Sequence, residues 1–122
     1  MNIKDIKSLG KIINQNHGND PLFILFDNLL EYNPDLSHKQ ARDYFIELLR
    51  YMLDNKMIKL AGVYTIKENI WEGSTDEILD KFRKWYPSES EWDFQSDASI
   101  KFYFFDYCFI RWLKPYPIEI KV

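Results

Sequence analysis

The spacing of hydrophobic residues predicts four helices, of which the first two lie in the N-terminal third. Apolar residues at helical spacing predict a helix over residues 3–15. Gly10 weakens this helix signal, because glycine disfavours a helix interior. The second helix should begin at Asp20-Pro21, because Asp suits the N-cap and Pro suits the first helical position. It should end at Asn33-Pro34-Asp35. The apolar positions of the two helices are Ile3, Ile6, Leu9 and Ile13, then Leu22, Leu25, Phe26 and Leu29.

The third and fourth helices each begin with a capping-box pattern, in which a serine is followed three positions later by Gln or Glu. These pairs are Ser37 with Gln40 and Ser74 with Glu77. Apolar stripes with i, i+3, i+4 spacing follow both. Pro87 should end the fourth helix. The stripes consist of Ala41, Tyr44, Phe45, Leu48, Leu49 and Met52, then of Ile78, Leu79, Phe82, Trp85 and Tyr86.

Two short apolar runs predict strands. Residues 57–60 follow the third helix, and residues 109–113 lie near the C-terminus, where they could pair with the first run. Residues 61–71 give no clear prediction, residues 88–97 read as an acidic surface loop, and residues 98–106 as a short helix.

The predicted fold class is therefore α+β and mainly helical. We expect four to five helices with a small two- or three-stranded sheet, in a single compact domain that spans residues 1–122. The C-terminal residues 115–122 should be extended.

Composition supports a cytoplasmic globular protein. With 46% hydrophobic residues, the chain can bury a core without disulfides or a structural metal. Its single cysteine, Cys108, lies in an apolar run and is predicted to be a buried, unreactive thiol. The N-terminus does not resemble a signal peptide, and no segment approaches the length of a membrane span.

Candidate chemistry is sparse, so we expect no enzymatic activity, cofactor or metal. His17 and His38 are far apart in sequence and are predicted to be surface residues rather than metal ligands. The four glycines form no phosphate-binding pattern. The carboxylates of Glu89, Glu91 and Asp93 are better explained as solvated charge than as an acid–base pair.

Negative charge is concentrated in one quarter of the chain. Residues 68–97 contain nine acidic and three basic side chains, although the whole chain carries a net charge of only −3. This balance disfavours nucleic acid as a partner and favours a basic protein surface.

Aromatic residues are interspersed with these acidic residues: Trp71, Trp85, Tyr86 and Trp92. Trp and Tyr often anchor protein–protein interfaces inside a polar surround. The same rings could instead cover the core beneath the loop. Both explanations remain open from the sequence.

The stretch from Trp71 to Ile78, then Phe82 to Pro87, an acidic loop and an aromatic end resembles small bacterial immunity proteins of contact-dependent growth inhibition. The resemblance covers about a third of the chain, residues 71–112. The resemblance implies a cytoplasmic protein that is paired with a toxin, as in toxin–antitoxin systems. In such a pairing the protein binds and neutralises a cognate toxin domain, commonly a nuclease, without catalysis.

The leading hypothesis is thus an immunity-type inhibitor with an acidic, aromatic-bearing contact surface. The alternative is a regulatory or adaptor module derived from a helix-turn-helix, since residues 22–60 read as helix, helix and strand. A small enzyme of unrecognised type is the third hypothesis. If the acidic surface is not the interface, the exposed face of the third helix around Asp43, Glu47 and Tyr51 is the next candidate. The predicted partner-binding residues are Glu72, Asp76, Glu89, Glu91, Trp92 and Asp93.

Overall fold

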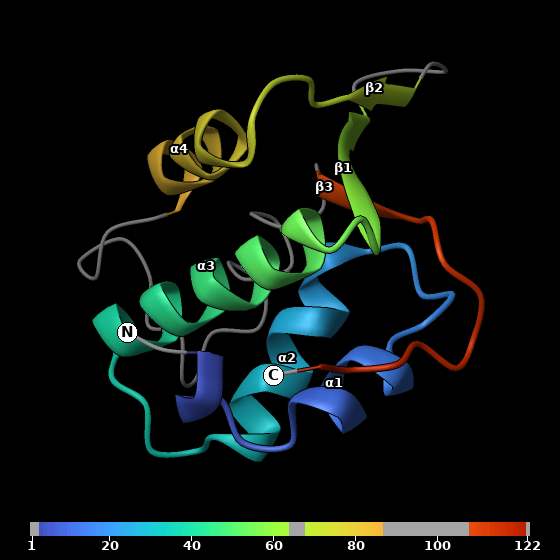
Figure 1. The fold of residues 1–122 in the computed structure, drawn as a ribbon. Helices are drawn as coiled ribbons and strands as arrows, with labels where there is room; N and C mark the ends of the chain where they lie inside the picture. Colours follow the sequence, from blue (N-terminus) through green and yellow to red (C-terminus); the bar gives the residue numbers. More distant parts are fainter. Residues whose placement is uncertain (1–2, 64–67, 87–107, 122) are drawn as a thin grey trace.

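Four α-helices and three β-strands make up the part of the chain that the computed structural model describes, residues 3–63, 68–86 and 108–121 (Figure 1). This arrangement confirms the predicted α+β, mainly helical fold class. In chain order the elements are the 3-10 helix η1 (Ile3–Asp5), α1 (Leu9–Gln15), α2 (Leu22–Tyr32), α3 (His38–Asp54), β1 (Ile58–Val63), β2 (Glu68–Ile70), α4 (Thr75–Trp85) and β3 (Cys108–Trp112).

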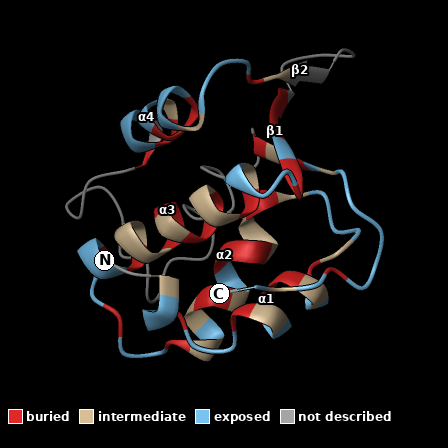
Figure 2. Ribbon diagram, in the orientation of Figure 1, coloured by how far each residue is buried: buried red, intermediate tan, exposed pale blue. Residues whose placement is uncertain are grey.

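Helix α3 is the central element of the helical layer. It packs against α2, α4, β1 and η1, and Figure 1 shows it between α4 on one side and α1 and α2 on the other. Its predicted apolar stripe is buried except for the half-buried Tyr44. The aromatic rings of Phe26, Phe45 and Phe82 join α2, α3 and α4 in one core. In Figure 2 the buried positions accordingly follow the inward faces of these helices.

The sheet has the strand order β2-β1-β3, and both pairings are antiparallel. Strand β1 pairs with β3 from Ile58↔Trp112 to Gly62↔Cys108, which confirms the predicted pairing of the two apolar runs. The difficult segment 61–71 contains the end of β1 and all of β2. The predicted loop 88–97 and helix 98–106 lie outside the described residues.

The predicted continuous helix over residues 3–15 is wrong. Ser8 adopts a left-handed backbone conformation with φ 57°, which separates η1 from α1. The break is compatible with burial of Ile6 and Leu9 on either side of it. The Lys7 amide is held by Asn33 Oδ1 at 3.2 Å instead of forming a helical hydrogen bond.

The predicted N-cap at Asp20 is also wrong, because α2 begins one residue later, with Pro21 as its N-cap. The backbone just before the helix forms contacts with the sheet instead. The Asp20 carbonyl accepts a hydrogen bond from the Ile110 amide at 2.7 Å, and Pro21 forms a bridge to Phe109. This short contact covers part of the outer edge of β3, where unpaired backbone groups would otherwise remain exposed.

Residues 113–121 form neither helix nor strand, and they run back across α1 and α3 (Figure 1). The extended segment predicted for residues 115–122 is interrupted by bends at Tyr116 and Pro117. Ile118 is buried in the core. The Asn14 side chain holds its backbone through two hydrogen bonds, and the Tyr51 hydroxyl holds that of Lys121. Among the helices of the described residues, none has the length and hydrophobicity that a membrane crossing requires.

Candidate functional site

The start of α4 carries the two predicted partner-binding residues that lie in the described part of the chain. Glu72 precedes the helix and Asp76 lies in its first turn, and both are exposed. The other four predicted contacts, Glu89, Glu91, Trp92 and Asp93, lie outside the described residues.

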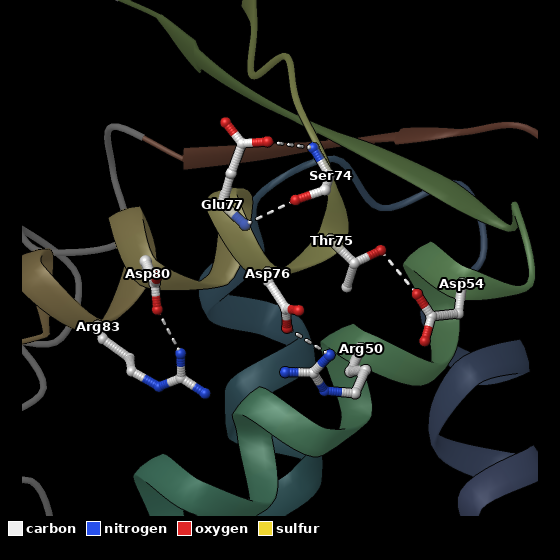
Figure 3. A network of polar contacts seen from close by, with 8 residues as sticks. All are labelled: Arg50, Asp54, Ser74, Thr75, Asp76, Glu77, Asp80 and Arg83. Atoms are coloured by element: carbon white, nitrogen blue, oxygen red, sulfur yellow. Dashed lines mark hydrogen bonds and ion pairs between the residues drawn. The ribbon is translucent and has the colours of Figure 1, made fainter.

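A capping box fixes the local geometry of this helix start. Ser74 Oγ accepts from the Glu77 amide at 3.2 Å, and Glu77 Oε1 accepts from the Ser74 amide at 3.2 Å (Figure 3). Gly73 enters the turn with φ 116°, a conformation that L side chains rarely adopt. A Cβ atom at Gly73 would also lie 3.3 Å from the Glu77 side chain. Glycine and the capping box therefore hold Glu72 and Asp76 in place.

Five exposed carboxylates gather around this helix start, and we call them the acidic cluster: Asp54, Glu72, Asp76, Glu77 and Asp80. Figure 3 shows Asp76 and Asp80 on the side of α4 that faces α3, with Glu77 pointing away from α3. The cluster thus presents negative charge on more than one side of the helix.

Two arginines neutralise the acidic cluster only in part. Arg50 Nη1 donates to Asp76 Oδ1 at 2.8 Å, and this hydrogen bond and charge raise the pKa of Arg50. Arg83 Nη1 donates to Asp80 Oδ1 at 2.7 Å. The Asp76 side chain remains 76% exposed, so its ion pair contributes little to stability. The five carboxylates of the cluster outnumber the two arginines that pair with them.

A groove of about 330 Å³ lies beside the acidic cluster. The end of α3, the start of β1 and the turn between β2 and α4 form its walls. Leu113, which is 46% exposed, is one of two large hydrophobic side chains that are exposed in the described ranges. The lining includes the apolar residues Leu53, Ile58, Ile70, Trp71, Ile78 and Leu113 and the charged residues Lys56, Lys59 and Glu72.

The sequence prediction included Glu72 but missed the rest of this groove. Its lining comes from five separate segments, and no spacing rule brings Leu53, Ile70 and Leu113 together. The available signal was Leu113 itself, an apolar residue at the end of the predicted strand 109–113 and beside Lys114.

Two of the four aromatic residues interspersed with the acidic segment have side chains that the structure describes. Trp71 is 5% exposed and Tyr86 is 8% exposed, so both cover the core and neither is an interface anchor. Tyr86 packs against Phe26, His38 and Phe82, and its burial raises the pKa of its hydroxyl. The Trp85 side chain and Trp92 lie outside what the structure describes.

The prediction of two surface histidines is wrong for His38. This residue is only 9% exposed, and its ring lies 5.2 Å from that of Tyr86, because the first turn of α3 packs toward the end of α4. His17 is half-buried, with ring contacts to Trp112 and Tyr116. Within the described ranges, no group of three His, Cys, Asp or Glu side chains is arranged to hold a metal ion.

The third-helix surface, the second candidate interface, is partly occupied by contacts within the protein. Asp43 pairs with Arg42 at 3.2 Å. The Tyr51 hydroxyl donates to the Lys121 carbonyl at 2.7 Å and accepts from the Lys121 amide at 3.0 Å. Tyr51 therefore has a structural role, and this surface is a weaker candidate than the start of α4.

Cys108 is a core residue, as predicted. It is 3% exposed on β3, and desolvation raises its pKa to about 12. At neutral pH the nucleophilic thiolate is therefore a very small fraction of the population.

We expect Cys108→Ser to lower the free energy of unfolding by about 1–3 kcal/mol, because it buries a hydroxyl where a thiol now packs. Urea denaturation monitored by circular dichroism measures this loss. The native wild-type protein should also react slowly with a thiol reagent at pH 7. Labelling at the rate of a free cysteine would show that the thiol is accessible.

Comparisons with protein-family models, with curated proteins and with solved structures find no match to this chain. A functional proposal therefore rests on the charge, exposure and shape of the chain's own surface.

Proposed function

We propose that this protein is an immunity-type inhibitor that binds the toxic domain of a cognate bacterial toxin and blocks it. The observation that carries the proposal is the exposed acidic cluster beside the apolar groove at the start of α4. The resemblance of residues 71–112 to immunity proteins of contact-dependent growth inhibition supports the same partner class. Such an inhibitor acts in the cytoplasm, with no cofactor and no catalytic step.

The charge of the acidic cluster suits a nuclease as the inhibited domain. A nuclease must attract phosphate, so its active-site surface tends to be basic. Complementary charge raises the association rate and selects against acidic partners. A negative surface of this kind can occupy such a site and exclude the nucleic acid.

The order α2, α3, β1, β2 favours a helix-turn-helix module as the alternative. Two of the cations on α3 are already engaged, however, since Arg42 pairs with Asp43 and Arg50 with Asp76. We therefore expect no appreciable binding of duplex DNA near physiological salt. Submicromolar, salt-sensitive binding in a fluorescence-anisotropy titration would support the alternative instead.

Charge reversal tests the inhibitor proposal. The first variant replaces Glu72, Asp76 and Asp80 with lysine, and the second replaces Glu89, Glu91 and Asp93. Each should slow association with the toxin domain encoded next to this gene by at least about tenfold and weaken its salt dependence. Trp92→Ala should speed dissociation, since loss of an aromatic anchor can cost about 2 kcal/mol. Surface plasmon resonance gives both rates, and co-expression with the toxin gives growth protection.

The matched control replaces three other exposed carboxylates with lysine: Glu31, Asp35 and Glu119. This control changes the net charge equally but leaves the start of α4 intact. The control should melt close to wild type, because exposed substitutions usually change stability by less than about 0.5 kcal/mol each. The first variant also loses the ion pairs of Asp76 and Asp80 with Arg50 and Arg83, so its folding is checked by thermal melting before its rates are compared. Full growth protection by both reversed variants, equal to that of the control, would contradict the proposed surface. A gene neighbourhood without a toxin would contradict the partner class.

A further inference from the structure

Residues 118–121, which we call the C-terminal segment, are held on the protein much as a peptide is held in a peptide-binding site. The Asn14 side chain contacts the amide and the carbonyl of Ile118, at 2.7 and 3.0 Å. The Tyr51 hydroxyl contacts the amide and the carbonyl of Lys121 in the same way, at 3.0 and 2.7 Å. The Ile118 side chain is buried in the core. We call the surface of α1 and α3 that makes these contacts the anchor site. Because it binds backbone groups and one apolar side chain, it fits this segment whichever copy of the chain supplies it.

A four-residue hinge, residues 114–117, separates the C-terminal segment from the end of the sheet. Its sequence is Lys-Pro-Tyr-Pro, and all four residues are exposed. A pocket of about 430 Å³ lies beside the hinge. Its lining includes Lys114, Pro115 and Pro117 of the hinge and, from the end of α3 and the turn after it, Tyr51, Asn55 and Met57. Part of the hinge therefore spans an open space instead of packing tightly against α3.

The contacts that hold the hinge on its own copy lie at the surface. The His17 Nε2 atom lies 2.6 Å from the Lys114 carbonyl oxygen, and the rings of His17 and Tyr116 are 5.9 Å apart. Exposed contacts of this kind open at a much lower free energy than the core. Lys114 and Tyr116 each precede a proline, a position that favours an extended backbone. The hinge can therefore straighten while Leu113 stays in place, where its amide donates to the Met57 carbonyl at 2.8 Å.

Exposed hydrophobic side chains gather at this hinge. In the described ranges, the two large hydrophobic side chains that are exposed are Leu113, at 46%, and Tyr116, at 66%. Leu113 lies directly before the hinge and Tyr116 within it. In a dimer with two-fold symmetry, a surface at the axis meets the same surface of the second copy. If two straightened hinges cross at such an axis, both side chains are removed from water, which stabilises the dimer.

We propose that this protein forms a two-fold dimer by exchanging its C-terminal segments. Residues 118–121 of each copy leave their own anchor site and occupy that of the second copy, and the straightened hinges cross between the two. Every anchor site is filled in the monomer and in the dimer, so the exchange keeps the contacts with Asn14 and Tyr51 and adds contacts between the hinges. The exchange needs no toxin, so the inference does not rest on the proposed function.

Exchange predicts two species that differ in mass. The anchor contacts are the same in both, so the dimer is favoured at high protein concentration, where association costs less freedom of motion. After incubation at millimolar concentration, size-exclusion chromatography with light scattering should resolve the 14.8 kDa chain and a species of twice that mass. The two should interconvert slowly, because Ile118 has to leave the core first. Wild type that stays monomeric at every concentration would overturn the inference.

A pair of cysteines identifies which copy fills each anchor site. A Cβ atom added at Gly10 of α1 would lie 3.9 Å from the Cβ atom of Ile120. Disulfides join Cβ atoms that are about 3.5–4.5 Å apart, so Gly10→Cys/Ile120→Cys should form one on oxidation. In the monomer this bond lies within one chain. In the exchanged dimer it joins two chains, so the dimer should survive denaturing electrophoresis until a reductant is added. A dimer whose disulfides stay within single chains would overturn the exchange in favour of association through the surface alone.

The matched control moves one cysteine away from the anchor site. Lys39 is exposed on α3, about 18 Å along the helix from Tyr51. Lys39→Cys/Ile120→Cys should therefore give no more covalent dimer than wild type, whose Cys108 is buried. Equal yields from the two cysteine pairs would overturn the exchange, since random collision then explains the bond. Circular dichroism of the reduced variants checks their folding, and light scattering on wild type tests the inference without any substitution.

Leu113→Ser tests the contact between the hinges. It should raise the dissociation constant of the dimer by at least about tenfold, because Leu113 loses its exposed surface only in the dimer. Lys114→Ser is the matched control: Lys114 is exposed in the same hinge, and its contact with His17 uses the backbone carbonyl. This control should leave the dissociation constant nearly unchanged. A dimer that is insensitive to Leu113→Ser would overturn the crossing of the hinges at the axis.

Discussion

Phe45→Ala is expected to lower the free energy of unfolding by about 3–5 kcal/mol, as large-to-small changes of buried aromatic residues do. Phe45 is fully buried on α3. Its ring meets that of Phe26 edge-to-face at 5.0 Å and lies 5.6 Å from that of Phe82. Removing it leaves a cavity where α2, α3 and α4 meet. Since small domains are stable by only about 5–15 kcal/mol, this loss is a large fraction of the total stability.

Denaturation in urea, followed by circular dichroism, measures this loss. Lys39→Ala is the control on the same helix, because Lys39 is exposed, and it should change stability by less than about 0.5 kcal/mol. Phe45→Leu should fall between the two. A loss below about 1 kcal/mol for Phe45→Ala would contradict the position of this ring at the centre of the core.

The elements that could be predicted from sequence are those whose determinants are local. Ser37 with Gln40 and Ser74 with Glu77 satisfy backbone groups within one helical turn, and both capping boxes form. The stripe of α3 could be predicted for the same reason, since one face of a helix repeats every three to four residues. The pairing of β1 with β3 followed from two apolar runs of similar length.

The failures depend on residues far apart in sequence. Helix α2 begins one residue later than predicted, because the Asp20 carbonyl binds the Ile110 amide, ninety positions away in the chain. His38 is buried because Tyr86 at the end of α4 covers it. The break at Ser8 accompanies the hydrogen bond between Lys7 and Asn33. Propensity and spacing contain no information about these contacts.

The candidate site likewise has a part with local determinants and a part that depends on residues far apart in sequence. Its charges are a property of composition, so the negative start of α4 could be predicted from the sequence. The groove could not, because strand register decides that Lys59 faces Arg111 and that Leu113 is left exposed. Register also depends on packing, which is why Trp71 could be judged a core residue only from the structure.

Asn14→Ala is expected to lower the free energy of unfolding by about 2–3 kcal/mol, the loss typical of two partly buried hydrogen bonds. Asn14 Oδ1 accepts from the Ile118 amide at 2.7 Å, and Asn14 Nδ2 donates to the Ile118 carbonyl at 3.0 Å. One side chain thus satisfies both backbone groups of a buried residue, much as a neighbouring strand would.

Hydrogen exchange distinguishes this local role from a general loss of stability. In Asn14→Ala the Ile118 amide should exchange with solvent much faster than amides of α3, since the C-terminal segment detaches before the core unfolds. Asn14→Asp should be similarly damaging, because it keeps the acceptor but places a carboxylate oxygen against the Ile118 carbonyl. Asn28→Ala is the matched control: Asn28 is half-buried on α2 and makes no side-chain hydrogen bond within the described residues. Equal losses for Asn14→Ala and Asn28→Ala would show that helix propensity, and not the clamp on Ile118, determines the effect.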